Sequence, residues 1–489
     1  MGERTRQVAG KKQTSGAART LACPARGGHI GGRPHFRPAG IAMPTTDVAR
    51  DVHAATAFLA RLFPRPRPFD VRLWDGSLLP AGGRTRFTLA VHSPGALRRM
   101  FRLPLALSLG EAYVRGDYDI EGDVWAAAPG MQAFRDALRS PRDARELLRL
   151  WRALPARGAA RAVDGARLDA EAGTREWDLQ GIRYHYDAGN DFYRLILGPT
   201  MLYSCAYFPT GSEDLDTAQE LKLEHVCRKL RLRPGDRLLD IGCGWGSLVI
   251  HAAQRFGVRA LGVTLSREQY ELATRRVAEA GLADRVTVRI EDYRDLPADA
   301  GGAFDKVASV GMFEHVGGAR LPEYFAHVHA LLKPGGLFLN HGIGGHVSPG
   351  RSARLAARRL LEERLVGSAE FRRRYIFPTG ELVSVSEANL AAERAGFEVR
   401  DVENLREHYA RTLRCWTRGL EENRDEAVRL AGMALYRLRR VHLGVAAWQF
   451  EAGHLTVNQS LLAKLDRGRA AVPWSRADLY ADLEKEASR

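Results

Sequence analysis

The pattern of apolar and polar positions divides the chain into two parts that should fold differently. Downstream of about residue 215, short apolar runs alternate with longer stretches whose apolar residues recur every three or four positions. The runs predict buried strands at 237–241, 259–263, 286–290, 304–309 and 336–340. The stretches predict helices at 216–231, 246–256, 266–280 and 319–332. Such regular alternation is typical of a parallel, doubly wound α/β sheet.

In the amino-terminal part, apolar and polar residues alternate with period two in short runs, and these runs lie between short helical stretches. This pattern predicts a small α+β domain over 46–130. Helices are expected at about 48–62, 95–101 and 105–114, and strands at about 71–73 and 87–91, joined by a turn at Gly82 and Gly83. The acidic residues near its end match no known metal loop and should be solvated: Glu111, Asp117, Asp119, Glu121 and Asp123.

A helical, arginine-rich linker is predicted over 131–177. Its apolar face carries Leu147, Leu148, Leu150, Trp151 and Leu154, and its arginines are Arg142, Arg145, Arg149 and Arg152. Two interpretations stay open, because the apolar face can pack on the protein while the arginines stay in water, or the helix can lie in a lipid interface. The domain that follows, 178–489, should end in helices at 409–422, 425–450 and 476–487.

The net charge of the chain indicates which kinds of partner it binds, and its cysteines indicate the redox state of its compartment. The 73 Lys and Arg against 58 Asp and Glu give a net charge of +15, which favours an anionic partner, either nucleic acid or anionic lipid. The five cysteines are scattered without a C-x-x-C pair, which argues against a disulfide framework and a zinc site and favours a reducing cytoplasm. No apolar run approaches the ~18 residues of a membrane span.

The first 45 residues are basic and rich in Gly, Pro and Ala, so a disordered tail is expected at 1–45. This tail could contact lipid or RNA. A simpler hypothesis is that Met43 is the true start of the protein and that residues 1–42 are not translated.

A glycine-rich turn follows the first strand of the larger domain. Asp240 lies at the end of that strand, and Gly242, Gly244 and Gly246 allow the backbone to approach a ligand before a helix begins. The spacing G-x-G-x-G differs from the dinucleotide fingerprint G-x-G-x-x-G. With Asp240 and the alternation downstream, the turn looks like the S-adenosylmethionine (SAM) site of a class I methyltransferase.

Ligands in an open α/β sheet bind beyond the carboxyl ends of the strands, which points to four further segments. After the second strand, Gln269 could hold ribose hydroxyls in place of the usual acid, or could form a capping box with Ser266. After the third strand, Asp292 could accept from an adenine amino group while Tyr293 stacks. After the fourth and fifth strands, Glu314 and His341 should face one pocket as an acid-base or anion site.

Aromatic residues are dense at 184–193 and 203–208, just before the glycine turn. They could form a lid over SAM, with ring faces that stabilise a cation, or they could be ordinary core. Cys205 lies among them, but no neighbouring feature marks it as an activated nucleophile.

Taken together, these motifs resemble the cyclopropane-fatty-acyl-phospholipid synthases and their mycolic-acid relatives. The matching strings are YHYDAGNDFY at 184–193, YSCAYF at 203–208, LLDIGCGWG at 238–246, GVTLSREQ at 262–269, SVGMFEHVG at 309–317, LKPGGLFLNHGIG at 332–344, YIFPTGEL at 375–382 and HYARTLRCW at 408–416. The resemblance covers about 178–470, and more loosely the amino-terminal domain through GEAYVRGDYDIEGD at 110–123. It implies a doubly wound, mostly parallel, seven-stranded Rossmann-like SAM methyltransferase sheet beside a smaller α+β domain that binds lipid.

The resemblance also implies a chemistry. A cis double bond in a phospholipid acyl chain attacks the SAM methyl group, a base removes a proton from the added carbon, and a ring closes. In the family the base is a bound bicarbonate, which here would contact the backbone of Cys205 and Ile343 and the side chains of Glu314, His341 and Tyr409. The implied SAM pocket, with the neighbouring turn and strand-end residues, comprises Tyr203, Ser204, Asp240, Gly242, Gly244, Gly246, Thr264, Leu265, Ser266, Gln269, Asp292 and Tyr293.

The chain departs from some members in two places. A cysteine once proposed as a nucleophile in the family aligns with Ala446, so covalent catalysis through it is excluded. The segment 347–374 is long and rich in arginine, and it could lie on anionic lipid, with about 1 kcal/mol from each basic residue near the surface. A solvated helix is the alternative.

Several functions compete with cyclopropane formation. A carbocation that loses a different proton gives a methyl- or methylene-branched chain, so a fatty-acyl C-methyltransferase is the first alternative. A lipid-binding protein without activity is another, opposed by the intact Glu314, His341 and Tyr409. Alkaloid N-methyltransferases do not suit the amino-terminal domain, and no N-P-P-Y motif supports nucleic acid as a partner.

The partners expected are therefore unsaturated, preferably anionic, phospholipids. The protein should be cytoplasmic and bind peripherally to the inner face of the membrane. No metal is expected, and the resemblance is compatible with a homodimer.

Overall fold

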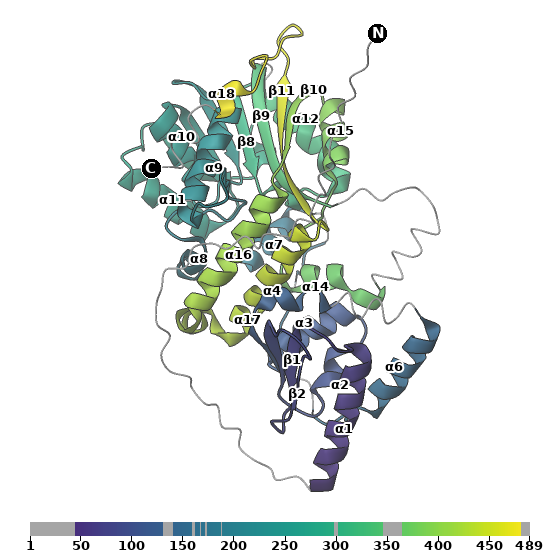
Figure 1. Cartoon of the computed structure of the whole chain (residues 1–489). Coiled ribbons are helices and arrows are strands. Elements are labelled where there is room, and N and C mark those ends of the chain that lie inside the picture. Colours follow the sequence, from purple (N-terminus) through teal and green to yellow (C-terminus); the bar gives the residue numbers. More distant parts are fainter. Residues whose placement is uncertain are drawn as a thin grey trace, which may run out of the picture.

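A computed structural model of the chain describes residues 45–130, 140–158, 162–166, 168–171, 174–186, 188–297, 302–345 and 364–480. The described residues form a larger domain around a central sheet and a smaller domain beneath it, with a pair of long helices at the junction (Figure 1). The predicted tail, the proposed start at Met43, most of the arginine-rich segment 347–374 and the end of the helix predicted at 476–487 lie outside the described residues.

The larger domain contains a seven-stranded sheet with the order β10-β11-β9-β8-β5-β6-β7. Its strands are β5 (Arg237–Ile241), β6 (Arg259–Thr264), β7 (Val286–Ile290), β8 (Phe304–Val310), β9 (Leu332–Gly344), β10 (Phe397–Asn404) and β11 (Thr456–Lys464). The five central strands from β9 to β7 are parallel, and β11 is antiparallel to both β9 and β10. The five predicted strands are present at their predicted places, and β10 and β11 were not predicted.

Helices cover both faces of this sheet (Figure 1). One face carries α9 (Leu215–Lys229), α10 (Ser247–Phe256) and α11 (Arg267–Glu279), and the other carries α12 (Leu321–Leu331) and α15 (Val385–Arg394). Successive side chains of β5 point to opposite faces of the sheet, so both helix layers pack on apolar residues. Leu238 packs in the core on one face, and Leu239 packs in the core on the other. Short 3-10 turns η1 (Tyr293–Asp295), η2 (Phe313–His315) and η3 (Gly318–Arg320) follow the strand ends.

Helix α9 begins at Leu215, one residue before its predicted start at 216. Asp214 is the N-cap, because its carboxylate accepts a hydrogen bond from Thr217 N at 2.8 Å. Burial together with the charge of Asp214 raises the pKa of the Asp216 carboxyl.

The small domain contains a four-stranded sheet with the order β2-β1-β3-β4. Its elements are α1 (Thr45–Leu62), β1 (Phe69–Arg72), β2 (Leu78–Leu79), β3 (Phe87–Val91), α2 (Ala96–Met100), α3 (Leu105–Arg115), β4 (Tyr118–Gly122), α4 (Val124–Ala127) and α6 (Pro141–Ala153). The expected turn at Gly82 and Gly83 does not make a hairpin of β1 and β3. The two strands pair in parallel, because β2, which comes between them in the chain, runs back antiparallel to β1 at the edge of the sheet.

The acidic residues near the end of this domain pair with arginines. Asp117 lies between Arg99 and Arg115, and Asp119 accepts from Arg437 at 2.8 Å. Asp123 caps α4 through Trp125 N and Ala126 N.

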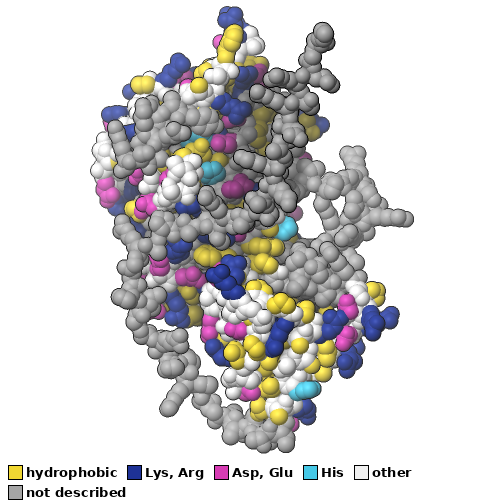
Figure 2. Space-filling model, in the orientation of Figure 1, with side chains coloured by type: hydrophobic (Ala, Val, Ile, Leu, Met, Phe, Trp, Pro, Cys, Tyr) yellow, Lys and Arg dark blue, Asp and Glu magenta, His cyan; other side chains and the backbone are white. Residues whose placement is uncertain are grey.

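Among the described residues of the predicted linker, α6 is a helix, and the described residues between Leu154 and the next helix, α7 (Arg175–Tyr186), are neither helix nor strand. Helix α6 is part of the small domain, since Leu147 and Leu154 lie in its core and Arg61 of α1 pairs with Asp143 and Glu146. Its four arginines, 142, 145, 149 and 152, are exposed together with Leu148, and basic side chains gather on that flank of the domain (Figure 2).

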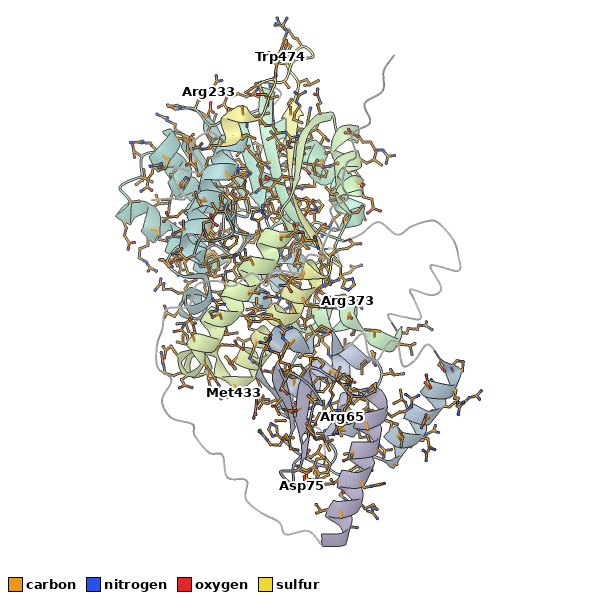
Figure 3. The ribbon with its side chains drawn as sticks, viewed as in Figure 1. Arg65, Asp75, Arg233, Arg373, Met433 and Trp474 are labelled. Atoms are coloured by element: carbon orange, nitrogen blue, oxygen red, sulfur yellow. The ribbon has the colours of Figure 1, made fainter. Side chains whose placement is uncertain are left out.

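Two helices hold the domains together. Helix α16 (Arg406–Glu422) packs along α17 (Arg424–Glu451), and α17 also contacts α3 and α4 of the small domain. Helix α17 is kinked at Gly432, whose φ is +79°, beside the exposed Met433 (Figure 3). The remaining elements are α8 (Asn190–Leu197), α14 (Ser368–Tyr375) and α18 (Ala477–Tyr480).

Candidate functional site

The glycine turn between β5 and α10 forms the floor of a cavity. Gly242 has a φ of +79°, and a Cβ there would lie 3.0 Å from the Cβ of Met312. Gly242 N and Cys243 N both donate to Val263 O at 3.0 Å, which fixes the turn against β6. Because Gly242 has no side chain, a ligand in the cavity can approach the backbone of the turn.

We name this space, of about 150 Å³, the glycine-turn cavity. Of the residues expected at the cofactor, it is lined by Tyr203, Ser204, Asp240, Gly242, Gly244, Thr264, Leu265, Gln269, Asp292 and Tyr293. Gly246 and Ser266 do not line it. Gly246 instead packs against α11, where a Cβ added at Gly246 would lie 3.1 Å from the Cβ of Ala273. Ser266 is the N-cap of the same helix.

The side chain of Gln269 is oriented at the cavity wall and does not complete the predicted capping box. Ser266 Oγ accepts from Gln269 N at 3.3 Å, which is half of the expected capping box. The other half is absent, since Thr264 Oγ1 donates to Gln269 Oε1 at 2.7 Å and also accepts from Ser266 N at 3.2 Å. The amide group of Gln269 is thereby oriented at the cavity wall, where a sugar hydroxyl would meet it.

Asp292 is held by a neighbouring arginine. Arg294 donates to its Oδ1 from Nε at 2.9 Å and from the backbone at 3.0 Å. Burial raises the pKa of Asp292, but these bonds outweigh it and hold the pKa below its ordinary value. Asp178 of α7 bridges Arg294 and Arg320, so a helix from before the glycine turn closes this side of the cavity.

Sequence reasoning missed a buried lysine in the same cavity. Lys222 of α9 is 1% exposed, and its Nζ donates to Ser204 Oγ at 2.8 Å. Burial lowers the pKa of Lys222 to about 8 and raises the pKa of Asp240 to about 7. Asp240 Oδ1 has no hydrogen-bond partner among the residues that the structure describes. The one available signal was a lysine within the apolar stripe of a helix predicted to be buried.

A second space, of about 110 Å³, lies beyond the ends of β8 and β9, and we name it the strand-end cavity. It is lined by all five residues expected at the reacting centre, Cys205, Glu314, His341, Ile343 and Tyr409. It shares Tyr203, Ser204, Gly311 and His315 with the glycine-turn cavity, so the two spaces adjoin.

Glu314 is the acidic group of this cavity. Ile343 N donates to its Oε1 at 2.7 Å, while Oε2 is buried and has no hydrogen-bond partner within the described part of the chain. Burial raises the pKa of Glu314 to about 7, against the opposite effect of the bond from Ile343. The free oxygen can accept a hydrogen bond from a ligand, or donate one when it is protonated.

His341 is held as a neutral donor. Gln459 of β11 donates from Nε2 to His341 Nδ1 at 3.1 Å, which leaves the proton of the neutral ring on Nε2. Burial and the charges of Lys222 and Lys229 lower its pKa to about 3. Gln459 escaped sequence reasoning because β11 itself did.

The surroundings of Cys205 do not favour a thiolate, as expected from the sequence. Its Sγ lies 3.2 Å from Ala206 O, and burial raises the pKa of the thiol above its ordinary value. Tyr409 stands against Phe450 and Trp416, with ring centroids 4.8 and 6.0 Å apart, and Ala446 is also in the wall.

The aromatic stretch divides between core and cavity. Phe192 and Tyr193 of α8 are 0% and 1% exposed and belong to the core, whereas Tyr203 lines both cavities. Trp245 Nε1 donates to Asn190 Oδ1 at 2.6 Å, which ties α8 to the glycine turn. The part of α7 that reaches the glycine-turn cavity contributes Asp178 and Ile182.

Comparison with known proteins identifies similar chains. A family model described as mycolic acid cyclopropane synthetase matches residues 174–460, and one described as a domain of unknown function matches 56–127. A probable fatty acid methyltransferase of Pseudomonas putida is 40% identical over 84% of this chain and 96% of its own length. The cyclopropane-fatty-acyl-phospholipid synthase of Escherichia coli is 39% identical over 52% of this chain and 59% of its own length.

Among solved structures, a mycolic acid cyclopropane synthase complexed with SAH and CTAB is 33% identical. It covers 58% of this chain and 98% of its own, with a TM-score of 0.53. These matches confirm both the family resemblance and the fold class predicted from the sequence.

Proposed function

Because this chain belongs to the mycolic acid cyclopropane synthetase family, we propose that it converts unsaturated phospholipid acyl chains into cyclopropane chains. The chain is a SAM-dependent methyltransferase of the cyclopropane synthase type. The observation that carries the proposal is that Cys205, Glu314, His341, Ile343 and Tyr409 line one cavity directly beside the glycine-turn cavity.

The glycine-turn cavity fits SAM. SAM supplies an electrophilic methyl group on a sulfonium when bound. The bare backbone at Gly242 lets a ligand approach, Gln269 offers an amide to ribose hydroxyls, and Lys222 offers a cation to a carboxylate. The shared wall at Tyr203 and Ser204 would place the methyl group toward the strand-end cavity.

The strand-end cavity fits bicarbonate, which would supply the base. The buried, unpartnered Oε2 of Glu314 needs a donor, and bicarbonate has one hydroxyl. Its negative oxygens need donors in turn, and His341 Nε2–H and the Tyr409 hydroxyl are among the donor groups of the residues that line this cavity. The raised pKa of Glu314 reduces repulsion between two neighbouring anions.

The reaction follows from this arrangement. The alkene π electrons bond to the methyl carbon as the sulfur takes the electrons of the broken bond, which leaves a carbocation on the acyl chain. The transferred carbon then loses a proton, and the electrons of that C–H bond close the ring. The chain's own residues exclude water, which would otherwise trap the cation, and offer the ring faces of Tyr203, Trp416 and Phe450.

A second candidate is a fatty-acyl C-methyltransferase that makes methyl- or methylene-branched chains. A specific observation favours it, since the Pseudomonas putida relative named a probable fatty acid methyltransferase aligns with both domains, over 84% of this chain. The two activities share every step up to the carbocation. Loss of a proton from a neighbouring chain carbon gives a methyl-branched alkene, whereas a hydride shift that moves the cation to the methylated carbon, followed by loss of a proton from the methyl group, gives a methylene branch.

We also propose peripheral binding to an anionic membrane surface. The described part of the chain has no helix long and apolar enough to cross a bilayer. The exposed arginines of α6 and the neighbouring Leu148 form a basic, partly apolar flank on the small domain (Figure 2).

The deciding experiment incubates purified protein with methyl-labelled SAM and vesicles whose lipids carry cis-unsaturated chains. The cyclopropane and methylene-branched products are isomers with the same mass, so proton NMR of the purified labelled fatty methyl esters must distinguish their protons from each other and from those of the unreacted alkene. Cyclopropane ring protons support the proposal, whereas exocyclic methylene protons or a methyl group on a chain carbon support the second candidate. No label in lipid contradicts both.

A further inference from the structure

A third cavity, of about 250 Å³, lies between the small domain and helices α14 and α17, and the proposed reaction does not yet use it. We name it the interdomain cavity, because α3 and α4 of the small domain, α14 and α17 all contribute to its wall. Helix α14, marked by Arg373 in Figure 3, lies beside the junction of the two domains. On the side of the small domain, which we call the inner end of the interdomain cavity, the wall is formed by Phe69, Phe87, Leu89, Met100, Tyr118 and Ile120.

The interdomain cavity adjoins the strand-end cavity. Arg372, His442, Ala446 and Gln449 line both spaces. The last three stand four and three residues apart on α17, which places them on one face of that helix. The three cavities therefore form a row in which the strand-end cavity lies between the glycine turn and the small domain.

An acyl chain with an internal double bond needs room on both sides of the reacting carbons. When those carbons lie in the strand-end cavity, one arm of the chain must enter a neighbouring apolar space. The side toward the glycine turn is the place of the methyl donor. The side toward the small domain opens into the interdomain cavity, whose walls are mostly aromatic and aliphatic.

The lining decides which arm enters. Phe69, Phe87 and Leu89 of the cavity wall are also members of the small domain's core. Among the described lining residues, Arg372 is the one charged side chain, and it lies at the boundary with the strand-end cavity rather than at the inner end. A phosphate head group would lose its hydration in such a space without a partner, whereas a methyl-terminal hydrocarbon arm gains by entering it.

We propose that the interdomain cavity binds the methyl-terminal arm of the acyl chain, so that the small domain selects substrates by the distance from double bond to methyl end. This inference rests on the proposed function and assigns a role to a domain whose family is described as of unknown function. It makes the small domain part of the substrate site rather than only a membrane anchor.

The first test narrows the cavity. Ala106 of α3 lines it and lies on a helix, so Ala106→Phe fills space without straining the backbone. Ala60→Phe on the exposed side of α1 is the matched control. Two sets of vesicles are compared, one that lengthens only the methyl side of the double bond and one that lengthens only the carboxyl side.

Ala106→Phe should change the ratio of turnover on short methyl arms to turnover on long ones by about tenfold in favour of the short arms, which is the effect of about two buried methylene groups. Ala60→Phe should leave this ratio unchanged. The carboxyl-side set should be unaffected. A shift confined to the carboxyl-side set, or no shift in either, overturns the inference. Wild-type turnover on these vesicles separately reports on the proposed function.

A second test needs no turnover. Trp448 lines the interdomain cavity, so a fatty acid brominated near its methyl end should quench the fluorescence component that Trp448→Phe removes. The same chain brominated near its carboxyl end should not. Stronger quenching by the carboxyl-end bromine, or equal absence of quenching by both, contradicts the assignment even if the enzyme assay fails.

Discussion

Ile343 N lies 2.7 Å from Glu314 Oε1, so the backbone of β9 holds one oxygen of a carboxyl that comes from the end of β8. The other oxygen is buried, and none of the described residues forms a hydrogen bond with it. We therefore predict that Glu314→Gln lowers turnover by at least about 10²-fold, the usual contribution of a proton-transfer group. SAM affinity should stay within a few fold, because Glu314 does not line the glycine-turn cavity.

Label transfer and calorimetric SAM binding measure the two effects separately. Glu323→Gln on the exposed side of α12 is the control. A Glu314→Gln enzyme that keeps most of its activity would rule out Glu314 as part of the anion site. His341→Ala should behave as Glu314→Gln does, since His341 lines the same cavity.

Burial raises the pKa of Glu314 from 4.5 to about 7, which makes stability depend on pH. In the folded state the carboxyl holds its proton more tightly than in the unfolded state, so its contribution is fully present below pH 4.5 and is lost as pH rises through about 7. Above that pH, Glu314→Gln should be more stable than the wild type by up to about 3 kcal/mol.

Denaturant unfolding of both proteins across this pH range tests the prediction. The stability difference between them should shrink as pH falls toward 4.5. A difference that stays constant with pH would show that Glu314 ionises normally in the folded protein.

Lys222 donates to Ser204 Oγ inside the glycine-turn cavity, and its pKa is about 8. We predict that Lys222→Met raises the KM for SAM by roughly tenfold or more, since a charged hydrogen bond contributes about 1.5 to 3 kcal/mol. In the wild type, SAM affinity should also weaken as pH rises above about 8, where the lysine loses its proton.

Ser204→Ala separates the hydrogen bond from the charge. It removes the bond but keeps the ammonium group, so it should retain the pH dependence that Lys222→Met loses. Equal pH profiles for wild type and Lys222→Met would contradict a role for the lysine charge in binding.

The catalytic fold and much of the site could be predicted because their signals are local. The strand before Gly242, the glycine turn and the strand ends at Glu314 and His341 are each written in a few consecutive residues. The structure brings Glu314 and His341 into one cavity because parallel neighbouring strands end at the same edge of the sheet.

The supports of the site could not be predicted, because they depend on pairings between distant segments. Gln459 meets His341 only because β11 inserts antiparallel beside β9, more than a hundred residues away in the chain. The boundary residue Arg372 reaches the reacting cavity through the packing of α14 at the domain junction. Neither contact leaves a periodic pattern in the sequence.

Arg440 clamps the domain junction. It is 7% exposed, and its guanidinium donates to Tyr113 Oη at 2.7 Å and to Ile120 O and Gly122 O at 3.1 Å each. Arg440→Ala leaves these acceptors buried, so we predict a loss of about 3 kcal/mol in unfolding free energy. Arg429→Ala on the same helix should cost far less, because Arg429 is exposed and pairs with Glu426 at the surface.

Differential scanning calorimetry and limited proteolysis check this prediction. The small domain of Arg440→Ala should be cleaved at lower temperature than the larger domain. Unfolding that stays as stable as in Arg429→Ala would show that the clamp contributes nothing.

The exposed arginines of α6 should determine membrane affinity. Replacing Arg142, Arg145, Arg149 and Arg152 by Gln removes four charges at about 1 kcal/mol each near an anionic surface, which predicts a loss of at least about 10²-fold in vesicle binding. Co-sedimentation with anionic vesicles measures the effect, and neutral vesicles should show little difference between variant and wild type. Activity on substrate dispersed in detergent should be preserved, since α6 lines none of the three cavities. Unchanged binding to anionic vesicles would mean that these arginines stay in water.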